Sequence, residues 1–319
     1  MKNMDRDHYD QTATVFSPDG RVYQVEYARE AIKRGGLAVG IRFRDGILFN
    51  IDKSIHSPLV EEDDLEKFFR ITGTIGAAAS GLIADARVLV DILREKAQAE
   101  KRRYGEEPDI RTLVEWVSRI YEVYTRYEGV RPFGTAMIIG GQDPSGFHLY
   151  ETDPSGVFQE RKAAAIGKGS RTAMELLEKY QDEGMSREEA IALSLMILKE
   201  TVQERPADVS RGEEIHILTK DGFERIDLDG DSPKLKEILG ASTWLILFEG
   251  KGEESLSDLE VFLSGTVGLN RIMVSVIMER FSTMEELMDA DMSDLTSLAG
   301  IGPATAGRIL KALKELEST

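Results

Sequence analysis

The amino-acid sequence predicts an α+β sandwich followed by a small all-α domain. Segments with strand and helix patterns come in groups: strands, two helices, strands, two helices, strands. Helices grouped in pairs are typical of layered antiparallel sheets, whereas a parallel sheet alternates single helices and strands. The helix pairs would cover the outer faces of two packed sheets. From Ser255 to Thr319 the pattern is helical throughout, which predicts the second domain.

The first half of the sandwich begins with a turn and a helix. Asp19 in the turn is placed to cap the helix expected over 21–34, along which Glu26 and Arg29 can pair. Two strand pairs follow, each with a short reversal, and then two long helices with apolar residues along one face. The expected strands are 37–43, 47–51, 68–72 and 75–79, and the expected helices are 82–102 and 110–127.

The second half repeats this order. Asp-Pro-Ser-Gly turns at 143–146 and 153–156 separate three expected strands, and the turn Asp221–Gly222 closes a final hairpin. The expected strands are 134–140, 147–150, 157–166, 214–218 and 223–226, with helices over 172–180 and 187–203 before the hairpin.

Composition excludes several kinds of protein. Apolar residues make up 41% and charged residues 30% of the 319 residues, so the chain can build a large core. It has no cysteine, which excludes disulfides and thiolate sites. Its four histidines are scattered along the chain, so we expect no metal and no cofactor. The net charge of −17 argues against the whole molecule lying on DNA or on an anionic membrane.

No apolar run is long enough to span a bilayer, and the first seven residues are too charged for a signal peptide. We therefore expect a cytoplasmic protein without a membrane partner.

One motif carries a resemblance to a known family. The run Phe16–Ala28 closely resembles the N-terminal signature of proteasome α-type subunits, and of the archaeal ones most of all. The resemblance covers residues 9 to about 240. It continues at Gly35, Asp52–Lys53, Glu66–Lys67, Ser80–Arg87, Gly129–Gly134, Asp153–Gly156 and Ala165–Gly167.

The resemblance implies a four-layer αββα sandwich of the Ntn-hydrolase type, in agreement with the element order. It also implies a non-catalytic subunit of the 20S core that forms heptameric rings with other α-subunits and caps the proteolytic β-subunits. Such a ring controls substrate access in ATP-dependent degradation and binds a proteasome-activating AAA+ ATPase.

An active threonine peptidase of the same fold is the alternative. The catalytic β-type relatives use an N-terminal threonine, whose own amine serves as the base. The resemblance aligns Gly36 with that threonine, and 35 residues precede it. Because glycine has no hydroxyl, we expect no catalytic residue in this chain.

Two further sites are implied by the resemblance. The segment 1–13 would be the gate at the axial pore, with the latch residues Tyr9, Asp10, Pro18 and Tyr27. The family usually has arginine where this chain has Gln11, which removes a charge from the gate. A pocket for the C-terminal carboxylate of the activator would contain Lys67, Arg29, Gly35, Gly81 and Leu82. Alternatively, Lys67 and Glu66 form an ordinary solvated pair.

The tail resembles a different family. Leu298–Leu310 is similar to a helix–hairpin–helix motif, and Phe262–Arg271 looks like a weaker first copy. Together they predict a tandem helix–hairpin–helix domain over 255–319, joined by a linker, 241–254, to the proteasome α-type domain over 14–240.

The tail suggests phosphate or partner binding. Its glycine-rich turn would expose backbone N–H groups at a helix start, with basic side chains nearby. The candidate residues are Gly300, Ile301, Gly302, Thr305, Arg308 and Lys311. From Ser255 onward, however, ten acidic and five basic residues give a net charge of −5, which disfavours DNA. The tail could therefore bind nucleic acid, dock a regulator or another protein, or serve a structural role.

Overall fold

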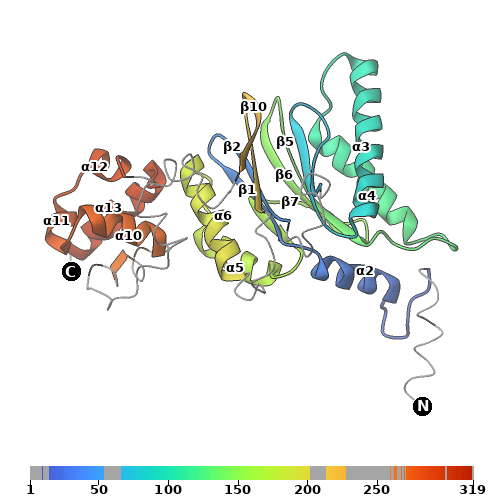
Figure 1. The fold of residues 1–319 in the computed structure, drawn as a ribbon, viewed down its shortest axis with the longest axis horizontal. Helices are drawn as coiled ribbons and strands as arrows, with labels where there is room; N and C mark the ends of the chain where they lie inside the picture. The colour runs from blue at the N-terminus through green and yellow to red at the C-terminus, as the bar shows by residue number, and fades with distance from the viewer. Residues whose placement is uncertain are drawn as a thin grey trace.

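The computed structural model describes residues 9, 14–53, 66–201, 213–227, 259, 262–263, 267, 269, 271–298 and 300–317. Figure 1 shows two β-sheets between helices, with further helices at the C-terminal end. This arrangement confirms the α+β sandwich and the helical character of the tail. The linker predicted at 241–254 lies outside the described residues.

The first sheet has five antiparallel strands. Its order is β10-β9-β2-β1-β8, so the first hairpin lies in the middle of the sheet. The strands are β1 (Ala38–Phe43), β2 (Gly46–Asp52), β8 (Ala163–Ile166), β9 (Glu213–Thr219) and β10 (Gly222–Asp227).

The second sheet is also five-stranded and antiparallel, with the sequential order β3-β4-β5-β6-β7. Its strands are β3 (Phe68–Arg70), β4 (Ile75–Gly81), β5 (Thr135–Asp143), β6 (Gly146–Thr152) and β7 (Phe158–Glu160).

The single strand expected over 157–166 is wrong, because the chain forms two strands there and they belong to different sheets. β7 pairs with β6 in the second sheet, and β8 pairs with β1 in the first. Arg161 and Lys162 make the crossing. The Arg161 N–H still donates to Leu149 in the second sheet, whereas the Lys162 carbonyl accepts from Arg42 in the first. Alternation along one strand does not show which sheet it joins.

Each sheet buries its two faces against different neighbours. In β2, Leu48 packs with the helix layer, while Ile47, Phe49 and Ile51 pack between the sheets. This alternation follows from the two-residue period of a strand. Every residue of β2 is buried, as expected for a central strand between two cores.

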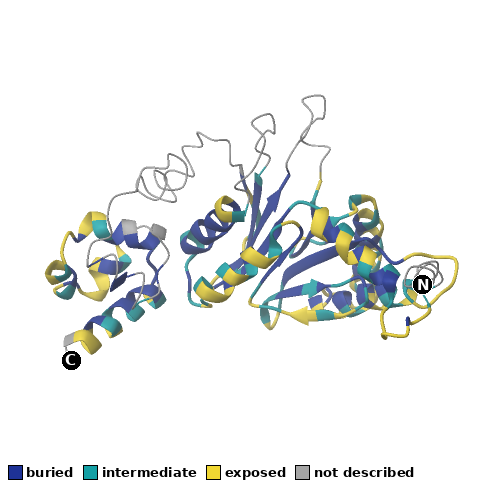
Figure 2. Cartoon of the chain, turned by 90° about the horizontal axis from the view of Figure 1, so that it is seen from below, coloured by how far each residue is buried: buried dark blue, intermediate teal, exposed yellow. Residues whose placement is uncertain are grey.

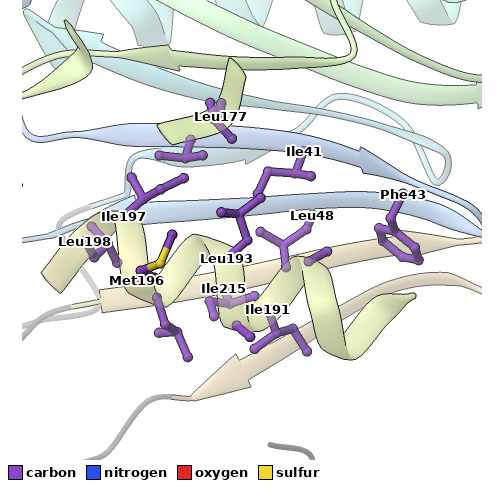
Figure 3. Packing of buried hydrophobic residues seen from close by; sticks show 14 of the residues in the cluster. Ile41, Phe43, Leu48, Leu177, Ile191, Leu193, Met196, Ile197, Leu198 and Ile215 are labelled. Carbon is purple, nitrogen blue, oxygen red and sulfur yellow. The ribbon is translucent and has the colours of Figure 1, made fainter. Parts of the chain in front are cut away.

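Two helix pairs form the outer layers. Helices α3 (Ile83–Tyr104) and α4 (Ile110–Tyr124) cover the second sheet. Helices α5 (Ser170–Tyr180) and α6 (Arg187–Thr201) cover the first. Figure 3 shows Leu193 and Ile197 of α6 packed with Ile41 and Leu48 of the first sheet. The four-layer arrangement is therefore complete.

The N-terminal helix α2 (Tyr23–Arg34) differs from the expectation in two contacts. Its N-cap is Val22, which makes no side-chain cap, so the capping role expected of Asp19 is wrong. Glu26 pairs with Arg21 rather than with Arg29. The turn is instead closed by Ser17, whose hydroxyl accepts from the Arg21 N–H at 3.1 Å.

The C-terminal helices have their own core. They are α10 (Arg271–Arg280), α11 (Met284–Met288), α12 (Met292–Thr296) and α13 (Pro303–Glu317). Leu263, Ile277, Leu287, Leu295 and Ile309 meet in this core, and Figure 2 shows buried residues on the inner sides of these helices. In the described part of the chain, no helix has both the length and the apolar character to cross a membrane.

Candidate functional site at the start of the first sheet

The chain enters β1 through Gly35 and Gly36, which neighbouring segments enclose. The Ser80 hydroxyl donates to the Gly36 carbonyl at 2.8 Å. The Lys168 N–H donates to the Gly35 carbonyl at 2.8 Å. Since these contacts come from β4 and from the loop after β8, both sheets position the start of β1.

Position 36 has no room for a side chain. A Cβ atom on Gly36 would lie 2.5 Å from the Asp52 carbonyl oxygen and 2.7 Å from the Lys67 ammonium. The carbonyl is part of the backbone at the end of β2, where the Asp52 N–H donates to Leu37 at 2.8 Å. A threonine at position 36 would therefore require the backbone to shift.

Lys67, predicted for the activator pocket, lies at the same place. Its Nζ donates to the Asp52 carbonyl at 2.8 Å, and the side chain is half-buried just before β3. This contact holds the ammonium beside the start of β1.

A cavity of about 480 Å³ opens beside Gly35, and Lys67 is not among the residues that line it. Three predicted pocket residues, Gly35, Gly81 and Leu82, line it together. Leu82 is 46% exposed, so the cavity has an accessible apolar wall. The remaining lining residues are Tyr27, Glu30, Ala31 and Arg34 of α2. The sequence motifs did not indicate Glu30, Ala31 and Arg34, although their helical spacing places them on the same side of α2 as Tyr27.

An ion pair joins the first turn of α3 to the segment before β5, next to the cavity residue Leu82. Asp85 binds Arg131 through both oxygens, at 2.6 and 2.8 Å, and also accepts from the Gly134 N–H at 2.8 Å. Burial acts to raise the pKa of Asp85, but the bonds from Arg131 and Gly134 outweigh it and lower the pKa. Both residues lie in segments that carried the resemblance, which was the signal that could have identified them.

Arg29, the other predicted pocket residue, faces a different cavity. Its guanidinium binds both oxygens of Asp153 at 2.9 Å. Burial raises the pKa of Asp153, but the hydrogen bonds from Arg29 and Ser155 lower it more, so the net pKa falls. Arg29 lines a cavity of about 870 Å³ between α2, the end of α4 and the 153–156 turn. This pair joins α2 to the second sheet.

The predicted gate residues are only partly described. Asp10 and Gln11 lie outside the described residues, and Tyr9 is half-buried. Pro18 is exposed in the 17–20 turn. Tyr27 is exposed on α2, where its ring stacks with that of Tyr23 at 6.4 Å between centroids. The latch formed by these residues stays a prediction.

Comparison with known proteins identifies the family. The proteasome subunit family matches residues 32–219, and the N-terminal signature of A-type proteasome subunits matches residues 9–31. The chain belongs to the proteasome subunit family. The SAM-like helix-hairpin-helix tandem matches residues 268–315. The predicted resemblances to both families are thereby confirmed.

Similar curated proteins are named as proteasome α-subunits. The α-subunit of Methanopyrus kandleri is 43% identical over 233 residues, or 73% of this chain and 94% of the relative. Those of Thermococcus kodakarensis and Methanococcus vannielii are 45% and 47% identical over 213 and 196 residues. These alignments cover 67% and 61% of this chain, and 80% and 76% of the relatives.

The candidate residues in the tail lie at the start of α13. Gly300 has a φ of +79°, the left-handed conformation that glycine permits in a tight turn. Ile301, Gly302 and Thr305 are buried, while Arg308 and Lys311 lie further along the helix. The Arg308 guanidinium is 3.5 Å from the Thr305 hydroxyl, and Lys311 pairs with Glu315 at 3.9 Å.

Proposed function

We propose that this chain is a non-catalytic α-ring subunit of the 20S proteasome core. Membership of the proteasome subunit family and the α-type names of its relatives support this function. The N-terminal signature at residues 9–31 supports the α-type assignment further. As in its family, the chain would assemble with other α-subunits into a ring that caps the β-subunits. We expect this particle to be cytoplasmic.

The observation that carries the proposal is Gly36. A threonine nucleophile needs a hydroxyl and a free amine at the start of the first strand. Gly36 has no hydroxyl and its nitrogen is part of a peptide bond. The Asp52 carbonyl and the Lys67 ammonium fill the space that a side chain would need.

The test measures hydrolysis of fluorogenic peptides by the purified chain, with and without β-subunits of an archaeal proteasome. The chain alone should be inactive, whereas the co-assembled particle should cleave peptides. Robust hydrolysis by the chain alone would contradict the proposal.

Gating and activator docking are the second part of the proposal. The segment 1–13 would gate the pore, with Tyr9, Asp10, Pro18 and Tyr27 as its latch. The activator pocket would lie between adjacent subunits, so a single chain contributes only part of its wall. The cavity lined by Gly35, Gly81 and Leu82 supports this position. Lys67 would contribute the ammonium that binds the activator's terminal carboxylate.

Replacing Lys67→Ala tests docking in the assembled particle. Losing a charge-assisted hydrogen bond should reduce stimulation by the AAA+ ATPase about tenfold or more. Lys162→Ala is the matched control, because this lysine is 63% exposed and pairs with Glu183 on another surface. Mass measurement would show that both rings assemble. Full stimulation of an assembled Lys67→Ala particle would reject the pocket.

A further inference from the structure

Glu189 is a fully buried carboxylate in the first turn of the outer helix α6. Burying such a group is costly unless hydrogen-bond donors surround it. Its Oε2 accepts from the Ser186 N–H at 2.6 Å, and the Ser186 hydroxyl accepts from the Glu189 N–H at 3.2 Å. This reciprocal pair is a capping box at the start of α6. It uses only one of the two carboxylate oxygens.

The other oxygen binds the C-terminal domain. Oε1 accepts from the Gly302 N–H at 2.9 Å and from the Thr305 hydroxyl at 2.6 Å. Both donors lie at the start of α13, and both bonds are buried. A single carboxylate therefore joins helix starts that are more than one hundred residues apart in the sequence.

The two surfaces fit closely around this carboxylate. A Cβ atom on Gly302 would lie 2.5 Å from Oε2 of Glu189. A Cβ atom on Gly184, in the turn before α6, would lie 3.0 Å from the Ala304 methyl. Larger side chains at these positions would push the hairpin away from α6.

The donors that hold Glu189 are those that a phosphate would use. A helix start presents free N–H groups and the positive end of the helix dipole, which together attract anions. The Thr305 hydroxyl adds a donor, and the neighbouring Arg308 adds positive charge. In this structure an anion from the same chain, Glu189, already occupies that position.

We propose that the hairpin of the C-terminal domain is a docking site for the Glu189 carboxylate. The contact holds the domain on α6, and while it persists these donors are closed to nucleic-acid phosphates. The net charge of −5 from Ser255 onward supports this role, because non-specific DNA binding requires a basic surface. The helix–hairpin–helix domain is then a docked part of the subunit.

The first test removes one donor without touching α6. Thr305→Val keeps the side-chain shape and leaves the Ser186–Glu189 capping box intact. Hydrogen–deuterium exchange of the full chain is followed by mass spectrometry over residues 300–306. Because one of the two donors to Oε1 of Glu189 is lost, exchange there should rise about tenfold. Thr296→Val is the matched control, because the Thr296 hydroxyl donates to the Met292 and Ser293 carbonyls of α12.

The second test changes the carboxylate itself. Glu189→Gln places an NH₂ group opposite the Ser186 or the Gly302 N–H, so it should raise exchange over the same residues. The matched control is Glu188→Gln, one residue earlier in α6. Unchanged exchange over 300–306 in Thr305→Val would overturn the proposal, since that variant leaves the capping of α6 intact.

A gel shift with a DNA duplex at low salt tests whether the hairpin donors bind nucleic-acid phosphates instead of Glu189. The full wild-type chain should give no shift. A shift by the wild-type chain that Thr305→Val abolishes would overturn the proposal, because the hairpin donors would then bind DNA in the presence of Glu189.

Discussion

The two outer helix layers differ in how much of their surface is buried. In α4, the buried residues form one stripe, while Arg111, Trp116 and Arg119 of the same helix are exposed. In α6, every residue from Glu189 to Leu198 is buried. A helix that is buried all round needs a cover on its outer side as well as a sheet beneath it.

The position of Glu189 shows where part of that cover comes from. Ser194 of α6 bonds to Asn50 of the first sheet at 3.1 Å, which fixes the sheet-facing side of the helix. At about 100° per residue, Glu189 and Met196 lie on the opposite side. Glu189 meets the C-terminal hairpin there. The comparison indicates that the outer side of α4 is exposed, whereas the outer side of α6 is covered.

The largest effect on stability is expected when a charge is placed on the outer side of α6, and the same change on α4 serves as the comparison. Met196 is 8% exposed, so Met196→Glu would bury an unpaired carboxylate. It should lower the free energy of unfolding by about 3 to 4 kcal/mol. Val123 of α4 is 45% exposed, and Val123→Glu should change the free energy by no more than about 0.5 kcal/mol. Denaturant titrations that give equal losses would break the comparison.

The next largest loss of stability is expected at a buried cluster of charged residues around Glu214. Glu214 of β9 lies 2.6 Å from the Lys53 ammonium and 3.2 Å from the Arg225 guanidinium. Removing one partner leaves buried charge uncompensated, so Glu214→Gln should cost about 3 kcal/mol at pH 7. Asp85→Asn, in the half covered by α3 and α4, should cost less because Arg131 is 59% exposed. The reverse order in denaturant titrations would contradict this account.

The contribution of Glu214 to the free energy of unfolding depends on pH. Burial acts to raise the pKa of Glu214, but His216 and Lys53 lower it more strongly, to about 2 from 4.5. A carboxyl whose pKa is lowered on folding adds stability above the unfolded pKa. That contribution is complete above pH 4.5 and is lost as the pH falls towards 2. Glu214→Gln should therefore reduce the loss of stability between pH 4.5 and 2. An equal loss in the variant and the wild type would exclude Glu214 as its source.

The smallest effect is expected on α2. The bidentate pair between Arg29 and Asp153 is partly exposed, so Arg29→Ala should lower the free energy of unfolding by about 1 kcal/mol. Lys33→Ala is the control, since Lys33 pairs with Glu30 in the same helix and is 65% exposed. If both variants lose the same stability, the link from α2 to the second sheet contributes nothing of its own.

Local patterns explain which parts of the fold were predictable. The short reversal between the strands expected over 37–43 and 47–51 and the turn at Asp221 both formed hairpins where they were predicted. The apolar stripe of α4 likewise follows from helical spacing. The crossing at Arg161 was not predictable, because strand alternation is the same in either sheet.

Contacts between residues far apart in the sequence limited how much of the candidate site could be predicted. Arg29 was expected to pair within α2, but its partner Asp153 is 124 residues away in the sequence. The cavity residues Gly35, Gly81 and Leu82 were found through their motifs. The role of Glu189 had no sequence signal beyond its capping box with Ser186, because the second oxygen binds a different domain.

The most direct measurement of the central claim uses a covalent inhibitor that reacts with N-terminal threonine. The chain is co-assembled with β-subunits, treated with the inhibitor, and separated for intact-mass analysis. The account predicts that the β-subunit gains the mass of the inhibitor and that this chain, with Gly36 at the start of its first sheet, keeps its own mass. An adduct on this chain would contradict its proposed role as a non-catalytic subunit.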